Sequence, residues 1–240
     1  MTGFDAIVIT AMAEEAAPFL ERASSVGDEV MSGNAGHRRL RLADRDVLLV
    51  RSGIGLVNAA GAATSAILAA RSEAPGAAPT VISAGSAGGI GAEVRVGDVV
   101  VGEEYINVDA DARAFGYPLG QVPRMPLSYH ADAAALKAIG GRALRWGEGE
   151  LTVRQGLVVS SYSFVTPERA ATIAADFPRV QATDMESSAI AQTSHVHGVP
   201  FVSVRGISDL CAATEFDAHI DDAAERSAAV VSALVSTLPS

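Results

Sequence analysis

Short apolar runs rich in β-branched residues recur along the chain, separated by longer alanine-rich segments. The first run, Phe4–Thr10, places Ile7, Val8 and Ile9 in succession, which is typical of a strand buried on both faces of a sheet. Comparable patterns predict further strands at Arg38–Leu42, Val47–Ser52, Pro79–Ala84, Val94–Ile106, Leu151–Ser160 and Phe201–Ile207.

The segments between these strands favour helices, because they are rich in alanine and are bounded by capping residues, prolines and glycines. Thr166 and Pro167, for example, provide an N-cap and a first-turn proline. Helices are predicted at Ala11–Ser24, Asn58–Arg71, Asp132–Leu144, Pro167–Asp176, Met185–His197 and Asp221–Leu238. This alternation, without a linker or repeat, predicts a single α/β domain over residues 1–240, and a hairpin turn at 44–46 predicts a mixed sheet.

One connection, Asn107–Tyr129, is unusually long and contains several prolines. Loops of this length are uncommon inside compact domains and tend to be functional, disordered or interfacial. Phe115, Tyr117 and Tyr129 argue against simple disorder, so we expect the loop to take part in binding or assembly.

Composition narrows the possible partners. The 240 residues include 18 basic and 28 acidic side chains, giving a formal net charge of -10, which disfavours nucleic acid and anionic membrane surfaces. No apolar run approaches the roughly 18 to 20 residues of a membrane span. Cys211 is the single cysteine and has no partner for an intramolecular disulfide. We therefore expect a soluble cytoplasmic protein that binds a small molecule.

Four polar segments follow apolar runs, at the strand ends where open α/β sheets build their sites. They are Thr10–Glu15, Ser83–Gly89, Asp184–Ser187 and Arg205–Asp209. Each also has a purely structural interpretation, as helix caps, as first-turn acidic residues, or as glycines in a tight turn or close packing, and the glycines do not form a G-x-G-x-x-G motif. The spacing of His195 and His197 does not suit one helical face, so no metal site is expected.

In this order, the segments resemble the nucleoside phosphorylase and nucleosidase superfamily, and within it the 5′-methylthioadenosine/S-adenosylhomocysteine nucleosidases. The resemblance covers nearly the whole chain. It is carried by Ala11-Met12 with a downstream Glu, Ser52-Gly53-Ile54-Gly55, Gly85-Ser86-Ala87-Gly88-Gly89, Val96-Gly97-Asp98-Val99-Val100, Asp109-Ala110-Asp111, Ala114-Phe115-Gly116-Tyr117, Gly120-Gln121, Pro123, Met185-Glu186 and Ile207-Ser208-Asp209.

This resemblance implies a three-layer α/β/α sandwich with a central mixed, partly barrel-like sheet, a homodimer, and hydrolysis of a purine nucleoside without metal or organic cofactor. It assigns leaving-group protonation at adenine N7 to Asp209, oriented by Ser208. Glu15 would polarise the attacking water, which Arg205 would help to position, and Glu186 would bind the ribose hydroxyls. Further substrate contacts are implied for Met12, Ile54, Ser86, Ala87, Gly88, Phe164, Val165, Met185 and Phe216, with Ala112, Phe115 and Pro123 closing the partner subunit's site.

Some features distinguish this chain from relatives and leave alternatives open. A phosphorylase would need phosphate-binding donors, but Glu15 stands near the expected anion position and Ser83 stands where those enzymes carry an arginine. Ser161-Tyr162 replaces Gly-Asp before Phe164, Asp184 replaces a Glu, and the segment Leu210–Glu215 is short. A nucleosidase for 6-amino-6-deoxyfutalosine or for a broad range of purines, a phosphorylase, and a non-catalytic nucleoside-binding or storage protein remain the alternatives.

Overall fold

The computed structural model describes residues 3–139, 144–146 and 149–238, and for 144–146 and 213–217 it describes the backbone alone. The helices are α1 Ala13–Arg22, α2 Leu56–Glu73, α3 Ala133–Ile139, α4 Pro167–Asp176, α5 Ser187–His197 and α6 Ala213–Val235, with a 3-10 turn at Arg113–Phe115. The strands are β1 Ala6–Thr10, β2 Ser25–Ser32, β3 Ala35–Leu42, β4 Arg45–Arg51, β5 Thr80–Gly89, β6 Val99–Asn107, β7 Tyr129–His130, β8 Leu144–Trp146, β9 Gly149–Leu151, β10 Val153–Ser160, β11 Val180–Asp184 and β12 Phe201–Asp209.

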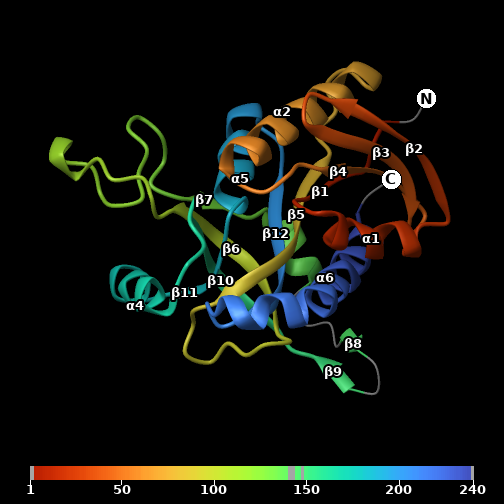
Figure 1. Ribbon diagram of the computed structural model, residues 1–240. Helices are drawn as coiled ribbons and strands as arrows, with labels where there is room; N and C mark the ends of the chain where they lie inside the picture. The colour runs from red at the N-terminus through yellow and green to blue at the C-terminus, as the bar shows by residue number, and fades with distance from the viewer. Residues whose placement is uncertain (1–2, 140–143, 147–148, 239–240) are drawn as a thin grey trace.

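Most of these strands form one twisted mixed sheet in the order β11-β10-β6-β12-β5-β1-β4-β3-β2 (Figure 1). The pairings of β1 with β4 and β5 are parallel, whereas β2, β3 and β4 form antiparallel pairs. At one end the sheet closes on itself, because β11 also pairs antiparallel with β5 through Ala182–Gly89 and Thr183–Gly88. The strands β5, β12, β6, β10 and β11 therefore form a small barrel, and the predicted mixed, partly barrel-like sheet is confirmed.

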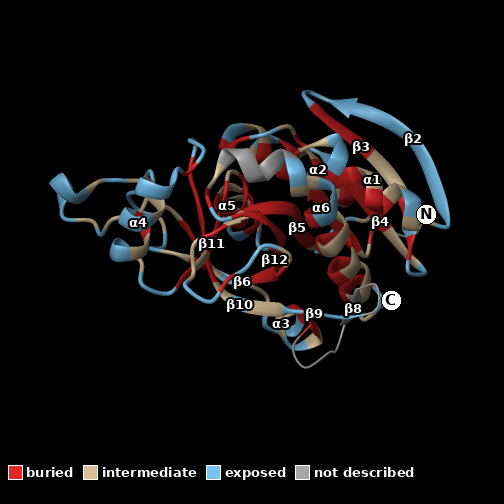
Figure 2. Cartoon of the chain, turned by 60° about the horizontal axis from the view of Figure 1, so that its bottom comes forward, coloured by how far each residue is buried: buried red, intermediate tan, exposed pale blue. Residues whose placement is uncertain are grey.

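Helices cover both faces of the sheet, because strands such as β1 carry apolar side chains on both of their faces. Ile7 and Ile9 pack in a core cluster with the alanines of α2 and with Ile190 of α5. Ala6 and Val8 point the other way, into a cluster with α1, α3 and α6. Alternate residues of a strand face opposite sides of a sheet, so an uninterrupted apolar run requires cover on both faces. Figure 2 shows these central strands buried beneath helices whose outer surfaces are exposed.

The main predicted strands and helices are present, although several bounds differ. β5 continues past Ala84 to Gly89, β6 begins at Val99, and α6 begins at Ala213, before the predicted Asp221. Of the two structural interpretations of its glycines, the extension of β5 excludes a tight turn and agrees with close packing, because the glycines continue a strand that pairs with β12 and β11. Glycine is needed at this end of β5 because side chains of β12 and of neighbouring segments come so close that a Cβ atom would meet them.

Three strands of the main sheet were not predicted: β2, β11 and the two-residue β7, which pairs with β6. All eight residues of β2 are exposed, because it is an edge strand with one neighbour, so its sequence lacks the alternation of a half-buried strand. β11 has five residues and lies between two predicted helices. Its burial comes from its neighbours in the barrel, a tertiary effect that a window of five residues does not encode.

Candidate active site

A cavity of about 220 Å³ opens where β1, β5, β11 and β12 end or pass into loops. Carboxyl ends of parallel strands are the usual place for a site in such sheets. Twelve of the sequence-predicted site residues line it: Met12, Glu15, Ile54, Ser86, Ala87, Gly88, Phe164, Val165, Met185, Glu186, Ser208 and Asp209. Segments far apart in the sequence are thus brought together, including all three acidic residues predicted to carry the chemistry.

Five further residues line the same cavity without having been predicted: Ala11, Ser163, Thr183, Asp184 and Cys211. Ala11 and Ser163 directly precede the predicted contacts Met12 and Phe164, so their place in the sequence could have indicated them. Thr183 and Asp184 belong to β11, whose pairing with β5 was not predicted. Cys211 reaches the cavity through a left-handed backbone conformation with φ 65°, which the sequence around it does not signal.

The remaining predicted residues lie elsewhere. Arg205 is only 1% exposed and lies beneath the cavity floor, and does not itself line the cavity. Ala112, Phe115 and Pro123 belong to the long loop that projects from the body of the chain (Figure 1) and do not line this cavity. The Phe115 side chain is 83% exposed. The side chain of Phe216 falls outside the described residues.

Glu15 is held at the amino end of α1 by main-chain and side-chain donors. One carboxylate oxygen accepts hydrogen bonds from the amides of Ala11, at 2.8 Å, and Met12, at 3.3 Å. The other accepts from the Ser86 amide at 2.8 Å and the Ser86 hydroxyl at 3.0 Å. Glu15 therefore both caps its helix and links α1 to β5, so its structural and functional interpretations are compatible.

Gly85 makes this position of Glu15 possible. A Cβ atom at residue 85, where φ is 152°, would lie 2.4 Å from the nearer Glu15 carboxylate oxygen. Real Cβ atoms do not tolerate such a separation, so the carboxylate occupies the space that glycine leaves open. The glycine of β5 is thus required by the close approach of a side chain from α1.

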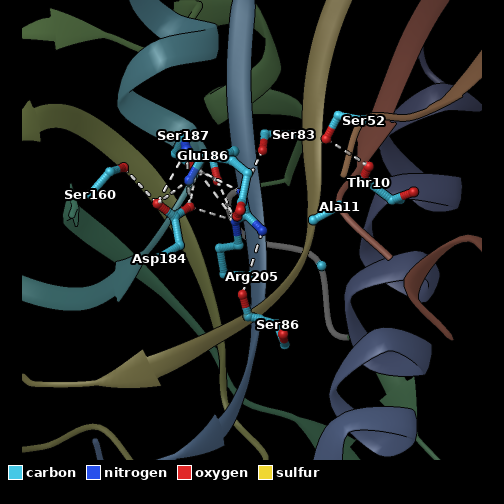
Figure 3. Close-up of polar contacts among 12 residues, drawn as sticks. Thr10, Ala11, Ser52, Ser83, Ser86, Ser160, Asp184, Glu186, Ser187 and Arg205 are labelled. Carbon is cyan, nitrogen blue, oxygen red and sulfur yellow. Dashed lines mark hydrogen bonds and ion pairs between the residues drawn. The ribbon is translucent and has the colours of Figure 1, made fainter. Parts of the chain in front are cut away.

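Beneath the cavity, the Arg205 guanidinium is the centre of a buried polar network (Figure 3). Its Nε lies 2.8 Å from the Asp184 carboxylate, and its Nη2 donates to the Ser83 hydroxyl at 2.6 Å. It also donates to the hydroxyls of Ser187 and Ser203. The network joins β5, β11, α5 and β12, because each contributes at least one of these groups.

Glu186 stands between this network and the glycine-containing loop before α2. One of its oxygens accepts a hydrogen bond from the Gly55 amide at 2.9 Å, and the other lies 3.8 Å from Arg205 Nη2. Burial raises the pKa of Glu186 to about 7, with further upward influence from Asp184 and Glu15, while Arg205 and the Gly55 amide act to lower it. Its ionisation therefore falls in the neutral pH range.

Asp209 lines the same cavity and lies at the end of β12. The Ser208 hydroxyl donates to one of its carboxylate oxygens at 2.8 Å. Thr183 and Cys211 crowd the same region, because their side chains and Asp209 all come within 3.4 Å of a Cβ atom built on Gly88. Burial, reinforced by Asp209, raises the pKa of the Cys211 thiol to about 12. Cys211 thus contributes a neutral wall beside the carboxylate.

The cavity combines carboxylates with apolar walls and has no lysine, arginine or histidine among its described lining residues. No cluster of three metal-ligating side chains occurs within the described ranges. The same part of the chain contains no helix long and apolar enough to cross a membrane. Such a cavity can offer proton transfer and hydrogen-bond acceptance to a neutral or cationic organic molecule.

Comparison with known proteins shows the family of the chain. The model of the phosphorylase superfamily matches residues 5–236. The 5′-methylthioadenosine/S-adenosylhomocysteine nucleosidase of Chromohalobacter salexigens is 39% identical over 96% of both chains. The chain belongs to this nucleosidase family of the phosphorylase superfamily.

Solved structures of family members superpose over almost the entire chain. The Neisseria meningitidis nucleosidase, in complex with methylthio-immucillin-A, is 40% identical with a TM-score of 0.88, covering 97% of this chain and 99% of that one. The Streptococcus pneumoniae nucleosidase, with a transition-state inhibitor, is 31% identical with a TM-score of 0.86, covering 98% and 99%. The likeness of fold therefore extends over nearly the whole chain.

The raised pKa of Glu186 predicts how its replacement changes stability with pH. A raised carboxyl pKa favours the folded state at low pH, and this contribution is lost as pH rises from about 4.5 to about 7. Glutamine does not ionise, so the Glu186→Gln variant does not lose this stability as pH rises. The free energy of unfolding of the variant minus that of wild type should therefore increase by roughly 2 to 3 kcal/mol between pH 5 and pH 8. Urea unfolding at both pH values measures it.

The control is Glu21→Gln, which removes the same charge from an exposed position of α1. Its stability relative to wild type should be the same at the two pH values within about 0.5 kcal/mol. A Glu186→Gln difference that stays constant or shrinks as pH rises would contradict the raised pKa.

Proposed function

We propose that the chain hydrolyses the N-glycosidic bond of 5′-methylthioadenosine and S-adenosylhomocysteine, releasing adenine and the 5-thioribose product. The observation that carries the proposal is the convergence of Glu15, Glu186 and Asp209 on one cavity in a chain of the nucleosidase family. In the reaction, a water oxygen bonds to C1′ as the C1′–N9 bond breaks. The bonding electron pair leaves with the purine, which receives a proton at N7, and the attacking water loses one.

Asp209 is the proposed proton donor, or proton relay, at the purine. Its position in the wall and the hydrogen bond from Ser208 support this role, because the bond orients one carboxylate oxygen and leaves the group facing the cavity. A positioned general acid contributes typically about 10²- to 10⁴-fold to such a reaction. Phe164 and Val165, which line the cavity, would bind the purine ring by stacking and through the Val165 main chain.

Glu15 is the proposed base that polarises water. Its carboxylate is fixed by four donors, so it would meet the water in one orientation with little reorganisation. Arg205 would act from below, through its contacts with Glu186 and with the Ser86 carbonyl at 3.4 Å. In this arrangement Arg205 positions the groups around the water and does not itself supply the proton acceptor.

Glu186 is the proposed acceptor for the ribose hydroxyls, with Met185 beneath the sugar. Departure of the purine gives the ribose oxocarbenium character, and a negative cavity stabilises that charge more strongly than it stabilises the neutral substrate. Met12 and Ile54 line the cavity and supply apolar surface for the 5′-alkylthio group. A thioether suits such surface because it gains from burial and forms only weak hydrogen bonds.

The cavity favours water over phosphate as the attacking group. No cationic side chain lines it among the described residues, and the buried Arg205 already bonds Asp184 and Ser83. Ser83, which stands where phosphorylases carry an arginine, is 0% exposed and accepts that bond. Phosphate at this site would lack charged donors and would face Glu15.

We further propose that two copies associate and that the loop carrying Ala112, Phe115 and Pro123 closes the partner's cavity. The loop projects from the body of the chain (Figure 1), its three named residues do not line their own cavity, and the Phe115 side chain is largely exposed, which supports contact with another chain. The cytoplasm is the proposed location, supported by the single cysteine, which leaves no intramolecular disulfide to form.

Glu15→Gln should lower kcat for adenine release by at least about 10²-fold, because the amide accepts the water proton poorly. Adenine release from 5′-methylthioadenosine is followed while circular dichroism confirms folding. The matched control is Glu14→Gln, which removes the neighbouring, exposed carboxylate of α1 and should keep near-normal turnover. Near-normal activity of Glu15→Gln, or an equal loss in the control, would remove Glu15 from its role.

Adenine should be released at the same rate in phosphate-free buffer and at millimolar phosphate, with free methylthioribose as the product in both. Mass spectrometry distinguishes this sugar from its 1-phosphate. Phosphate-dependent release would identify a phosphorylase. Cleavage of 6-amino-6-deoxyfutalosine in preference would reassign the substrate, and absence of any release at high enzyme concentration would favour a binding or storage role.

Closure by the partner's loop predicts complementation between two weak variants. Phe115→Ala lacks the donated ring and Glu15→Gln lacks the proposed base, so each alone should release adenine slowly. A mixed dimer restores one complete site, formed by the Phe115→Ala cavity and the other protomer's loop. Mixing after subunit exchange should raise activity above the average of the two, whereas strictly additive rates would contradict the shared site.

A further inference from the structure

Tyr162 joins two walls of the candidate site. It lies in the segment between β10 and α4, and its hydroxyl accepts a hydrogen bond from the Val57 amide of α2 at 3.1 Å. Its ring also packs on the loop before α2, since a Cβ atom at Gly55 would lie 3.5 Å from it. This tyrosine belongs to the Ser161-Tyr162 pair that replaces Gly-Asp in the family pattern.

The contact is made at the amino end of α2, where main-chain amides lack partners within the helix. The N-cap is Gly55, which has no side chain to cap those amides. Two of the donors there are taken from outside the helix: the Val57 amide bonds Tyr162, and the Gly55 amide bonds Glu186 at 2.9 Å. Tyr162 and Glu186 are therefore held by two donors only two residues apart, one in the first turn of α2 and one at its N-cap.

Tyr162 is itself anchored on its own side of the cavity. Its amide donates to the Asp109 carboxylate at 2.6 Å, and the Ser161 hydroxyl donates to the same carboxylate at 3.3 Å. Asp109 also forms an ion pair with Arg169 of α4. These contacts fix the main chain at residue 162, so the tyrosine side chain connects a braced segment to the loop that holds Glu186.

The joined segments line the cavity on both sides of this connection. Ile54 of the glycine loop lines it, and so do Ser163, Phe164 and Val165, which follow Tyr162 directly. The two segments are 105 residues apart in the sequence at the Tyr162–Val57 bond. A shift of one segment against the other would separate the wall proposed to hold the purine from the carboxylate proposed to hold the ribose.

We propose that Tyr162 is a positioning residue that holds the Gly55 amide on Glu186 and thereby fixes the ribose-binding carboxylate relative to the purine-binding wall. The inference rests on the proposed function, because it assigns Tyr162 a part in nucleoside cleavage. Tyr162 acts through Gly55 and Glu186 and takes no proton from the substrate.

The pH dependence of kcat/KM gives a readout specific to this role. Arg205, Asp184 and Glu15 are the charged groups that face Glu186, and its pKa of about 7 is held down in part by the Gly55 amide. Loosening that amide raises the pKa of Glu186 further. The acid limb of kcat/KM, which reports ionisation in the free enzyme, should then move to higher pH.

The test compares Tyr162→Phe with wild type, using adenine release from 5′-methylthioadenosine between pH 5.5 and 8.5. The variant keeps the ring and loses one neutral hydrogen bond, so kcat/KM should fall about three- to tenfold near pH 6. The loss should shrink toward pH 8.5, where Glu186 is ionised in both proteins. Asp109→Asn, which weakens the anchor without touching the tyrosine ring, should shift the profile in the same direction.

The matched control is Tyr129→Phe, because the Tyr129 hydroxyl lies outside the candidate cavity and has no hydrogen-bond partner within the described part of the chain. It should leave the profile unchanged. If the pH profile of kcat/KM for Tyr162→Phe is unchanged, or if kcat/KM falls by the same factor at every pH, the positioning role is overturned. Cleavage by wild type would in that case still support the proposed function. Absence of adenine release by wild type would instead overturn the proposed function.

Discussion

The barrel end of the sheet is built around one buried guanidinium, that of Arg205, whose charge must be paired. Arg205 is 1% exposed on β12, and an unpaired charge at such a depth would cost several kcal/mol. Its compensation comes from the Asp184 carboxylate at 2.8 Å and from serine hydroxyls on β5, β12 and α5. Because these partners belong to different strands and a helix, the arginine is satisfied only when the barrel end of the sheet is assembled.

The same charge sets the electrostatics of the cavity above it. One guanidinium faces Asp184, Glu186 and Glu15, so the buried carboxylates outnumber the buried cation. Burial raises the pKa of Glu186 to about 7, and the neighbouring carboxylates of Asp184 and Glu15 add to this rise. The excess of negative charge also supplies the field that would favour a sugar acquiring positive charge in the transition state. The fold therefore stabilises Arg205 with groups that leave the cavity electronegative.

Much of this arrangement could be predicted from the sequence. The continuous apolar runs indicated strands buried on both faces, and the order of short motifs indicated which strand ends carry polar groups. Glu15, Glu186 and Asp209 could be placed in this way because each follows a recognisable strand or precedes a recognisable helix. The comparison with known proteins confirms the predicted family and the predicted fold. The roles of the individual residues stay predictions.

The parts that could not be predicted are those decided by long-range pairing. β11 has five residues and no alternation to mark it, yet its pairing with β5 brings Thr183 and Asp184 to the cavity. The sequence marked Asp184 as the start of a polar segment and as a departure from the family pattern, but its ion pair with Arg205 depends on closure of the strands. The hydrogen bond from Val57 to Tyr162 likewise joins residues with no local relationship in the sequence.

Barrel closure explains why these long-range contacts converge on one place. β5 is hydrogen-bonded to β12 along most of its length and turns at its glycine-rich end to meet β11. Asp184, at the end of β11, therefore lies over Arg205 of β12, and Glu186 follows two residues later at the start of α5. In an open sheet, β11 would be separated from β5 by β10, β6 and β12, and the arginine would lose its carboxylate. The ring of strands is thus the element that converts separate strand ends into a single electronegative cavity.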